Sequence, residues 1–359
     1  MPTDKIAHGT ERNGTERNVY LDIIKGIAII SVVFGHCIQC GSGMEFLQSR
    51  SFFHDAVFKA IYGCHMALFM LVSGYLFGMS LRRNNWNQVF GNRFKLLLLP
   101  LMSWGLIGVF TIVTHYHGVF ALIKSIVGHY LNSMWFIWAI FYNSLFVLLV
   151  RRFCKDRLSV YFIAYLLLFV TPDMFSFSLY KYMYPFFVCG YVICRFNLLI
   201  KTKEVLFSKL VLSVVCMVSY VLLMQFFSYE SYIYTSGYSV VNFKIGEVEL
   251  WKLWNDIFRM VTAFVGSIFV FLFVYGIWKR TEELFVWRII ANLGKASLVV
   301  YLFSGEVIFS HILPKVTWDF EHSYFVNFLE TIIILIICYL IYSVMKNVRI
   351  LTKVFLGGR

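Results

Sequence analysis

Residues 18–40 read NVYLDIIKGIAIISVVFGHCIQC, a stretch long and apolar enough to cross a bilayer as one helix. The stretch nevertheless carries Asp22, Lys25 and His36, and ionisable groups are costly in hydrocarbon unless they are paired or functional. Lys25 and His36 are separated by about 16 Å of helical rise and lie about 20° from a whole number of turns. We therefore expect the two side chains on one face of the helix, at two depths.

The rest of the chain has the composition of a membrane protein. Of its 359 residues 60% are apolar and 14% are charged, and the mean hydropathy is +0.73, well outside the range of soluble domains. Ten apolar segments are candidates for spanning helices: 19–39, 56–80, 96–114, 132–150, 158–171, 183–200, 208–228, 259–277, 292–312 and 325–345. The predicted fold is an all-α integral membrane protein, a bundle of about ten transmembrane helices.

The basic residues predict the orientation of this bundle. If the amino terminus is inside, most of the 32 Lys and Arg residues fall in inner segments, as expected for short cytoplasmic loops. We therefore expect a cytoplasmic tail over 1–18, a transmembrane domain over 19–345 and a second cytoplasmic tail over 346–359. The first apolar segment is interpreted as a retained helix, and no soluble domain is expected at either end. The net charge of +13 then reflects topology and contact with membrane lipid, not nucleic-acid binding.

Polar residues in the apolar segments separate into two levels. Cations lie towards the predicted inner side, and they suit an anionic ligand that carries phosphates: Lys25, Arg93, Lys95 and Lys295. Groups with acid and base chemistry lie in the outer half, where a histidine suits proton transfer at neutral pH: His36, His65, Glu306 and Glu330.

Each of these residues also has a structural interpretation. Asp22 and Lys25 are three residues apart and can neutralise each other, and Arg93 and Lys95 can be ordinary basic residues of an inner loop. His65 can be a hydrogen-bonded polar group without a catalytic role. The tryptophans near the outer surface, Trp135 and Trp138, match an aromatic belt.

Two further features concern the outer side. Cys37 and Cys40 form a C-x-x-C motif that permits a disulfide or half of a metal site, but no second ligand pair stands nearby, so no metal is expected. The longest outer loop, residues 229–256, mixes charges with aromatic residues. It is too polar to span and large enough to form a lid or an acceptor groove.

Six stretches resemble acyltransferase family 3, membrane acyltransferases that O-acetylate bacterial surface sugars. The first, YLDIIKGIAIISVVFGH, is similar to a first-helix motif in which a basic residue and a histidine are separated by ten residues, here Lys25 and His36. The others are CHMALFMLVSGYLF with His65, NRFKLLLLP with Arg93 and Lys95, the pair MWFIWAIF and YPFFVCGY, and LGKASLVVYLFS with Lys295. Two positions depart from the family pattern: Leu96 replaces an arginine and Ser304 replaces a closing histidine.

The resemblance implies an O-acyltransferase of the bacterial inner membrane. Its donor would be cytosolic acetyl-CoA, and its acceptor a hydroxyl of a surface polysaccharide or a lipid-linked sugar. Lys25, Arg93, Lys95 and Lys295 would bind the phosphates of the donor. His36 would act as general base or acyl carrier, with His65 and Glu306 as further catalytic candidates.

Two alternatives remain open from the sequence. A transporter or flippase would use His36, Glu306 and Glu330 as a proton relay and form no bond, although few acidic residues lie at mid-depth. An enzyme of the same architecture would instead transfer another acyl group, such as succinyl. A homo-oligomer is also left open.

Overall fold

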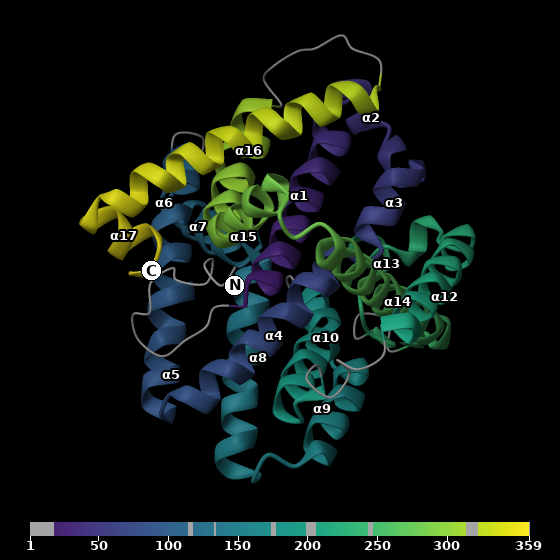
Figure 1. The fold of residues 1–359 in the computed structure, drawn as a ribbon. Coiled ribbons are helices and arrows are strands. Elements are labelled where there is room, and N and C mark those ends of the chain that lie inside the picture. Colours follow the sequence, from purple (N-terminus) through teal and green to yellow (C-terminus); the bar gives the residue numbers. More distant parts are fainter. Residues whose placement is uncertain are drawn as a thin grey trace, which may run out of the picture.

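The computed structural model describes residues 18–113, 118–132, 134–173, 177–198, 206–242, 247–313 and 322–358. Over these residues the chain is nearly all helical (Figure 1). The exception is a pair of two-residue antiparallel strands, β1 (Val241–Asn242) and β2 (Glu247–Val248), in which Val241 lies opposite Val248.

Seven helical stretches of the described chain are long and apolar enough to cross a membrane. They are α1 (Val19–Cys40), α3 with α4 (Ala56–Tyr62, His65–Arg83), α5 through η2 into α6 (Trp86–Arg93, Phe94–Leu98, Leu99–Val113), α8 (Trp135–Phe153), α14 (Leu250–Arg280), α15 with η4 (Phe285–Phe303, Ser304–Ile312) and α16 (Tyr324–Asn347). The shorter apolar helices are α9 (Leu158–Val170) and part of α12 (Leu206–Gln225). The protein is therefore a helical integral membrane protein, as expected.

Each of the ten predicted segments falls mostly on a helix over its described residues. The sixth, 183–200, lies mostly in α10 (Phe177–Arg195). The number of crossings and their orientation stay predictions, and the predicted tail over 1–18 lies almost wholly outside the described residues. The other helical elements are α2 (Met44–Gln48), η1 (Ser51–His54), α7 (Val119–Asn132), η3 (Tyr229–Ser231), α13 (Ile233–Ser236) and α17 (Arg349–Phe355).

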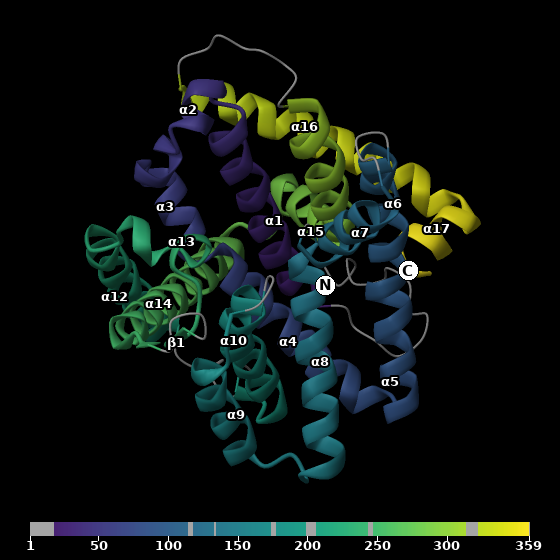
Figure 2. The same cartoon turned by 180° about the vertical axis from the view of Figure 1, so that it is seen from behind.

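Helix α1 runs through the middle of the bundle, where α3, α4, α15 and α16 pack around it (Figures 1 and 2). Glycines allow α1 and α15 to approach closely. A Cβ on Gly26 would lie 2.0 Å from the Ile290 carbonyl oxygen, and one on Gly294 would lie 1.9 Å from that of Asp22. Small residues at helix contacts are typical of membrane bundles, because dispersion between close backbones replaces the hydrophobic effect there.

Helices also pack at the sides and at one end of this central group. Helices α12 and α14 form a pair at one side, and α16 lies across one end of the molecule (Figure 1). Helix α17 turns back against α6, where Trp104 Nε1 donates to the Phe355 carbonyl at 3.3 Å. The segment predicted as a carboxy-terminal tail therefore contains a packed helix.

The structure changes the extent of the predicted outer loop 229–256. Helix α14 already begins at Leu250, so that Asp256 lies inside the helix together with Arg259. The two side chains are three residues apart and form an ion pair of 2.5 Å, and this mutual neutralisation lets charged residues enter a spanning helix. The prediction of loop up to residue 256 was wrong for this reason.

Candidate active site

Two adjoining cavities lie along α1. The first, here called the basic cavity, has a volume of about 180 Å³ and is lined by Lys25, Ser73, Arg93 and apolar side chains. The second, the histidine cavity, has a volume of about 470 Å³, and its lining includes His36, His65 and Glu306. The larger volume lies in the range of small-molecule sites.

Three side chains belong to the walls of both cavities: Val32, Met66 and Tyr301. Val32 lies on α1 between Lys25 and His36, as expected for residues that share one face of that helix. The cavities therefore adjoin along α1, and the predicted rise of about 16 Å between Lys25 and His36 leads from the lining of one cavity to the lining of the other.

Lys25 lines the basic cavity but is also paired. Its Nζ lies 2.8 Å from Asp22 Oδ1, and Asp22 is 4% exposed. Asp22 and Lys25 therefore neutralise each other, as their structural interpretation predicts, because a buried carboxylate needs a counter-charge. The pair leaves Lys25 on the cavity wall, so that one side chain can neutralise Asp22 and still face a ligand.

Arg93 enters the basic cavity from the end of α5. Its guanidinium lies over the Phe77 ring at 4.7 Å, a cation–π contact that orients it. The chain continues from there as the π-helical turn η2, and π-helical turns are frequent at functional sites because they shift side chains out of the regular helical register.

The structure does not bring all predicted donor-binding residues together. Lys95 and Lys295 are both exposed, and neither is among the described residues that line the two cavities. Lys295 Nζ instead donates to Asn292 Oδ1 at 3.2 Å. Ser297 and Leu298, two and three residues further along α15, do line the basic cavity.

His36 and His65 meet in the histidine cavity across Tyr62. The Tyr62 ring lies 4.9 Å from the His65 ring and 6.4 Å from the His36 ring. His36 also packs against Phe309 at 4.9 Å. The predicted pair of outer histidines is therefore brought to one cavity from α1 and from the start of α4.

His65 has a defined tautomer. Its Nδ1 donates to the Ile61 carbonyl at 2.7 Å, because a carbonyl oxygen can only accept. The hydrogen of the neutral ring is thus on Nδ1, and Nε2 keeps a lone pair that can accept a proton or a hydrogen bond.

Glu306 is 3% exposed and lies in the π-helical segment η4. Its Oε2 lies 3.3 Å from His129 Nε2, which comes from α7. Gly108 of α6 makes room for this pair, since a Cβ there would lie 2.2 Å from His129 Cε1. Burial lowers the pKa of His129 on this short helix. His129 belongs to none of the motifs quoted from the sequence, and no spacing in the sequence relates it to Glu306.

The C-x-x-C motif, possible metal ligands and Ser304 are the remaining candidate features. Cys37 and Cys40 are free thiols, so the disulfide alternative is wrong. Within the described ranges, no group of three or more His, Cys, Asp and Glu side chains is placed to hold a metal ion. Ser304, which replaces the histidine usual in the resembling family, lines the histidine cavity and donates to the Val300 carbonyl at 2.5 Å.

Similar curated proteins include two nodulation proteins NolL. The one from Sinorhizobium fredii (strain NBRC 101917 / NGR234) is 31% identical over 183 residues, which cover 50% of this chain and 49% of the relative. The one from Mesorhizobium japonicum (strain LMG 29417 / CECT 9101 / MAFF 303099) is 29% identical over 208 residues, covering 54% and 53%. The chain thus spans about half the length of the curated relatives it matches.

A comparison with protein families agrees with the motifs quoted from the sequence. No solved structure matches this chain. The family model of the acyltransferase domain matches residues 18–346, which contain every residue of the two cavities. The chain therefore belongs to this family of membrane acyltransferases.

Proposed function

We propose that the protein transfers an acetyl group from acetyl-CoA to a hydroxyl of a cell-surface polysaccharide or of its lipid-linked sugar precursor. The observation that carries this proposal is the pair of adjoining cavities, one with cations and one with histidines, which share Val32, Met66 and Tyr301. The chain belongs to an acyltransferase family, which favours acyl transfer over transport. A transporter would also not need a site for an acyl donor.

The basic cavity is proposed as the donor site. Coenzyme A carries a pyrophosphate and a 3′-phosphate, and Lys25 and Arg93 are cations on the cavity wall that neutralise such groups. Lys95 and Lys295 are exposed, so they would contact only those parts of the donor that lie outside the cavity. The pantetheine arm would extend past Val32 and carry the thioester to His36.

In the general-base route, the acceptor hydroxyl gives its proton to the imidazole of His36, and the oxygen attacks the thioester carbonyl. The carbon–sulfur bond then breaks, and the coenzyme A thiolate takes up the proton. Such proton transfer contributes about 10² to 10⁴ in rate. His65, whose Nε2 has a free lone pair, and Glu306, which is paired with His129, would help to hold the proton in this cavity.

In the acyl-carrier route, a nitrogen of His36 attacks the thioester first, and coenzyme A leaves as thiolate. The acceptor oxygen then attacks the acyl-imidazole, and its proton passes to a neighbouring base. Both routes place the chemistry at His36, between a donor that arrives from the cytoplasm and an acceptor on the other side of the bacterial inner membrane.

The test uses membranes from cells that express the protein. They are incubated with acetyl-CoA labelled in the acetyl group, and glycan and lipid extracts are examined for label. Label in a sugar fraction that depends on the protein supports the proposal. Protein-dependent label from succinyl-CoA alone would show that the transferred group is succinyl. Absence of label in every fraction with both donors would overturn the assignment as an acyltransferase.

A further inference from the structure

Three of the aromatic side chains that line the histidine cavity come from three different elements. Tyr62 ends α3, Trp135 begins α8, and Tyr234 lies in α13 of the outer loop. The Tyr234 ring lies 6.3 Å from the Tyr62 ring and 6.4 Å from the Trp135 ring. Since Tyr62 also contacts both histidines, this aromatic group is one ring away from the proposed chemistry.

Tyr234 does not pack as a core residue. Its side chain is 49% exposed although it lines a cavity, whereas the neighbouring tyrosines Tyr232 and Tyr238 are 2% and 0% exposed. A tyrosine that lines a cavity and is itself open presents an aromatic surface to a ligand. The contrast within seven consecutive residues argues against a general aromatic belt.

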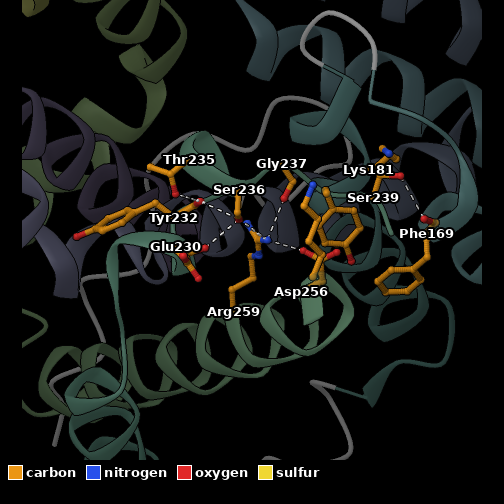
Figure 3. A network of polar contacts seen from close by, with 12 residues as sticks. Phe169, Lys181, Glu230, Tyr232, Thr235, Ser236, Gly237, Ser239, Asp256 and Arg259 are labelled. Atoms are coloured by element: carbon orange, nitrogen blue, oxygen red, sulfur yellow. Dashed lines mark hydrogen bonds and ion pairs between the residues drawn. The ribbon is translucent and has the colours of Figure 1, made fainter. Parts of the chain in front are cut away.

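A network of polar contacts holds the loop that carries Tyr234 (Figure 3). Nη2 of Arg259 in α14 donates to Ser236 Oγ and to the Gly237 carbonyl, each at 2.9 Å, and to Asp256 Oδ1 at 2.5 Å. On the other side of Tyr234, the Tyr232 hydroxyl donates to the Phe53 carbonyl at 3.0 Å. The backbone is thus held on both sides of Tyr234.

A second anchor follows directly after it. Asp173 Oδ2 accepts from the Tyr238 backbone N–H at 2.7 Å, and Asp173 Oδ1 lies 2.6 Å from Lys181 Nζ. Gly237 has a φ of +73°, and a Cβ there would lie 2.5 Å from Asp173 Oδ2, so glycine is required for the turn.

These anchors are buried at a cost. Lys181, Asp256 and Arg259 are no more than 2% exposed, and desolvation of buried ion pairs often exceeds their attraction. Such charges are better explained by specifying one position of the loop than by stabilising the fold. The position they specify is the one that places Tyr234 in the cavity.

The remaining lining indicates a neutral, hydroxyl-rich ligand. Polar side chains accompany the aromatic rings, among them Gln39, Ser304 and Ser310, while the described lining residues include no Lys or Arg. A pyranose ring combines C–H faces, which the negative face of an aromatic ring attracts, with a rim of hydroxyls that hydrogen bond. A phosphate would lack a counter-charge here, and an acyl chain would leave the polar groups unused.

We propose that Tyr234, with Trp135 and Tyr62, forms a stacking subsite for a pyranose ring of the acceptor, and that Arg259 positions the loop that carries Tyr234. The inference rests on the proposed function, because the ring to be stacked is that of the acylated sugar. The ring can belong to a lipid-linked precursor or to a finished polysaccharide, since both present the same faces and hydroxyls.

The test measures acetyl transfer by the purified full-length protein in lipid nanodiscs. Two envelope fractions serve as acceptors: water-soluble glycan and solvent-extracted lipid-linked sugar. The variants are Tyr234→Ala and Tyr234→Phe, with Phe120→Ala as the control, because Phe120 is 84% exposed and is not among the lining residues of either cavity. We expect Tyr234→Ala to raise the KM for the acceptor about tenfold and to leave the KM for acetyl-CoA unchanged. Tyr234→Phe keeps the ring face and should stay within about twofold of the unmodified protein.

The loop is tested separately with Arg259→Lys and the milder Ser236→Ala. Both should raise the KM for the acceptor without changing that for acetyl-CoA, and Arg259→Lys should have the larger effect because lysine cannot reproduce the guanidinium contacts. If Arg259→Lys fails to fold, Ser236→Ala still reports on the loop. The acceptor fraction that shows the Tyr234→Ala effect identifies the source of the sugar.

Three results would overturn the inference in distinguishable ways. An unchanged acceptor KM in Tyr234→Ala, or an equal rise of both KM values, would remove the subsite and leave the transferase assignment intact. Label in a lipid that contains no sugar would show that the acceptor is not a sugar. No transfer by the unmodified protein to either fraction would remove the proposed function and the subsite with it.

Discussion

The two cavities along α1 differ in charge and in what surrounds their polar groups. The basic cavity carries Lys25, already paired with Asp22, and Arg93, oriented by Phe77. The histidine cavity combines His36 and His65 with Glu306 and aromatic rings, and no Lys or Arg is among its described lining residues. The comparison indicates a division of labour: one cavity suits a phosphate-bearing group, and the other suits proton transfer with a neutral ligand.

Removal of the His36 imidazole should produce the largest effect. His36→Ala is expected to lower acetyl transfer by about 10² or more, because both routes need this ring, while the donor KM stays unchanged. Turnover with labelled acetyl-CoA measures it, with His54→Ala as control, since His54 is exposed on η1 and lines neither cavity. Near-normal transfer by His36→Ala would show that the histidine cavity is not the site of chemistry.

Obstruction of the wall shared by the cavities should have the next largest effect. Val32 is 4% exposed and borders both cavities, so Val32→Phe would narrow the passage between them. Transfer should fall roughly tenfold or more through misplacement of the thioester, while binding of coenzyme A stays intact. Equilibrium binding and turnover are measured on one preparation, and Val286→Phe serves as control because Val286 is 46% exposed on α15. Full activity in Val32→Phe would mean that the cavities work separately.

Substitution of a cation on the wall of the basic cavity should affect the KM for acetyl-CoA more than substitution of a cation on the surface. Arg93→Gln is expected to raise the KM for acetyl-CoA about tenfold, the value of a charge-assisted hydrogen bond. Lys295→Gln should change it by less than about twofold, because exposed charges are screened by solvent. Steady-state kinetics with Lys279→Gln as a further surface control provide the measurement. Equal effects of the Arg93 and Lys295 substitutions would contradict the assignment of the donor to the basic cavity.

The glycine contact beside the basic cavity should affect stability more than activity. Gly294→Ala places a Cβ against the Asp22 carbonyl, and such overpacking costs about 1–3 kcal/mol. Gly276→Ala in α14 meets nothing within 4 Å and should be neutral or stabilising by up to about 1 kcal/mol. Thermal unfolding in detergent compares the two variants. A Tm for Gly294→Ala equal to that of Gly276→Ala would show that α1 and α15 can separate freely at this point.

The sequence alone was sufficient for the helical membrane fold, the family and the alignment of Lys25 with His36 on one face of α1. The fold and the shared helix face depend on local composition and on helical periodicity, and the family is indicated by the resemblance of short motifs. A single chain displays all of these without knowledge of its neighbours. The expected separation of inner cations from outer histidines also agrees with the two cavities, although the catalytic roles stay predictions.

Only the tertiary structure decided which polar residues meet. His129 reaches Glu306 through the space left by Gly108, Tyr234 reaches the histidine cavity from a loop anchored by Arg259, and Lys295 faces away from the basic cavity although its neighbours line it. The physical reason is that these contacts join segments far apart in the chain. Helical periodicity predicts the face of a residue on its own helix, and the packing of the other helices decides what that face meets.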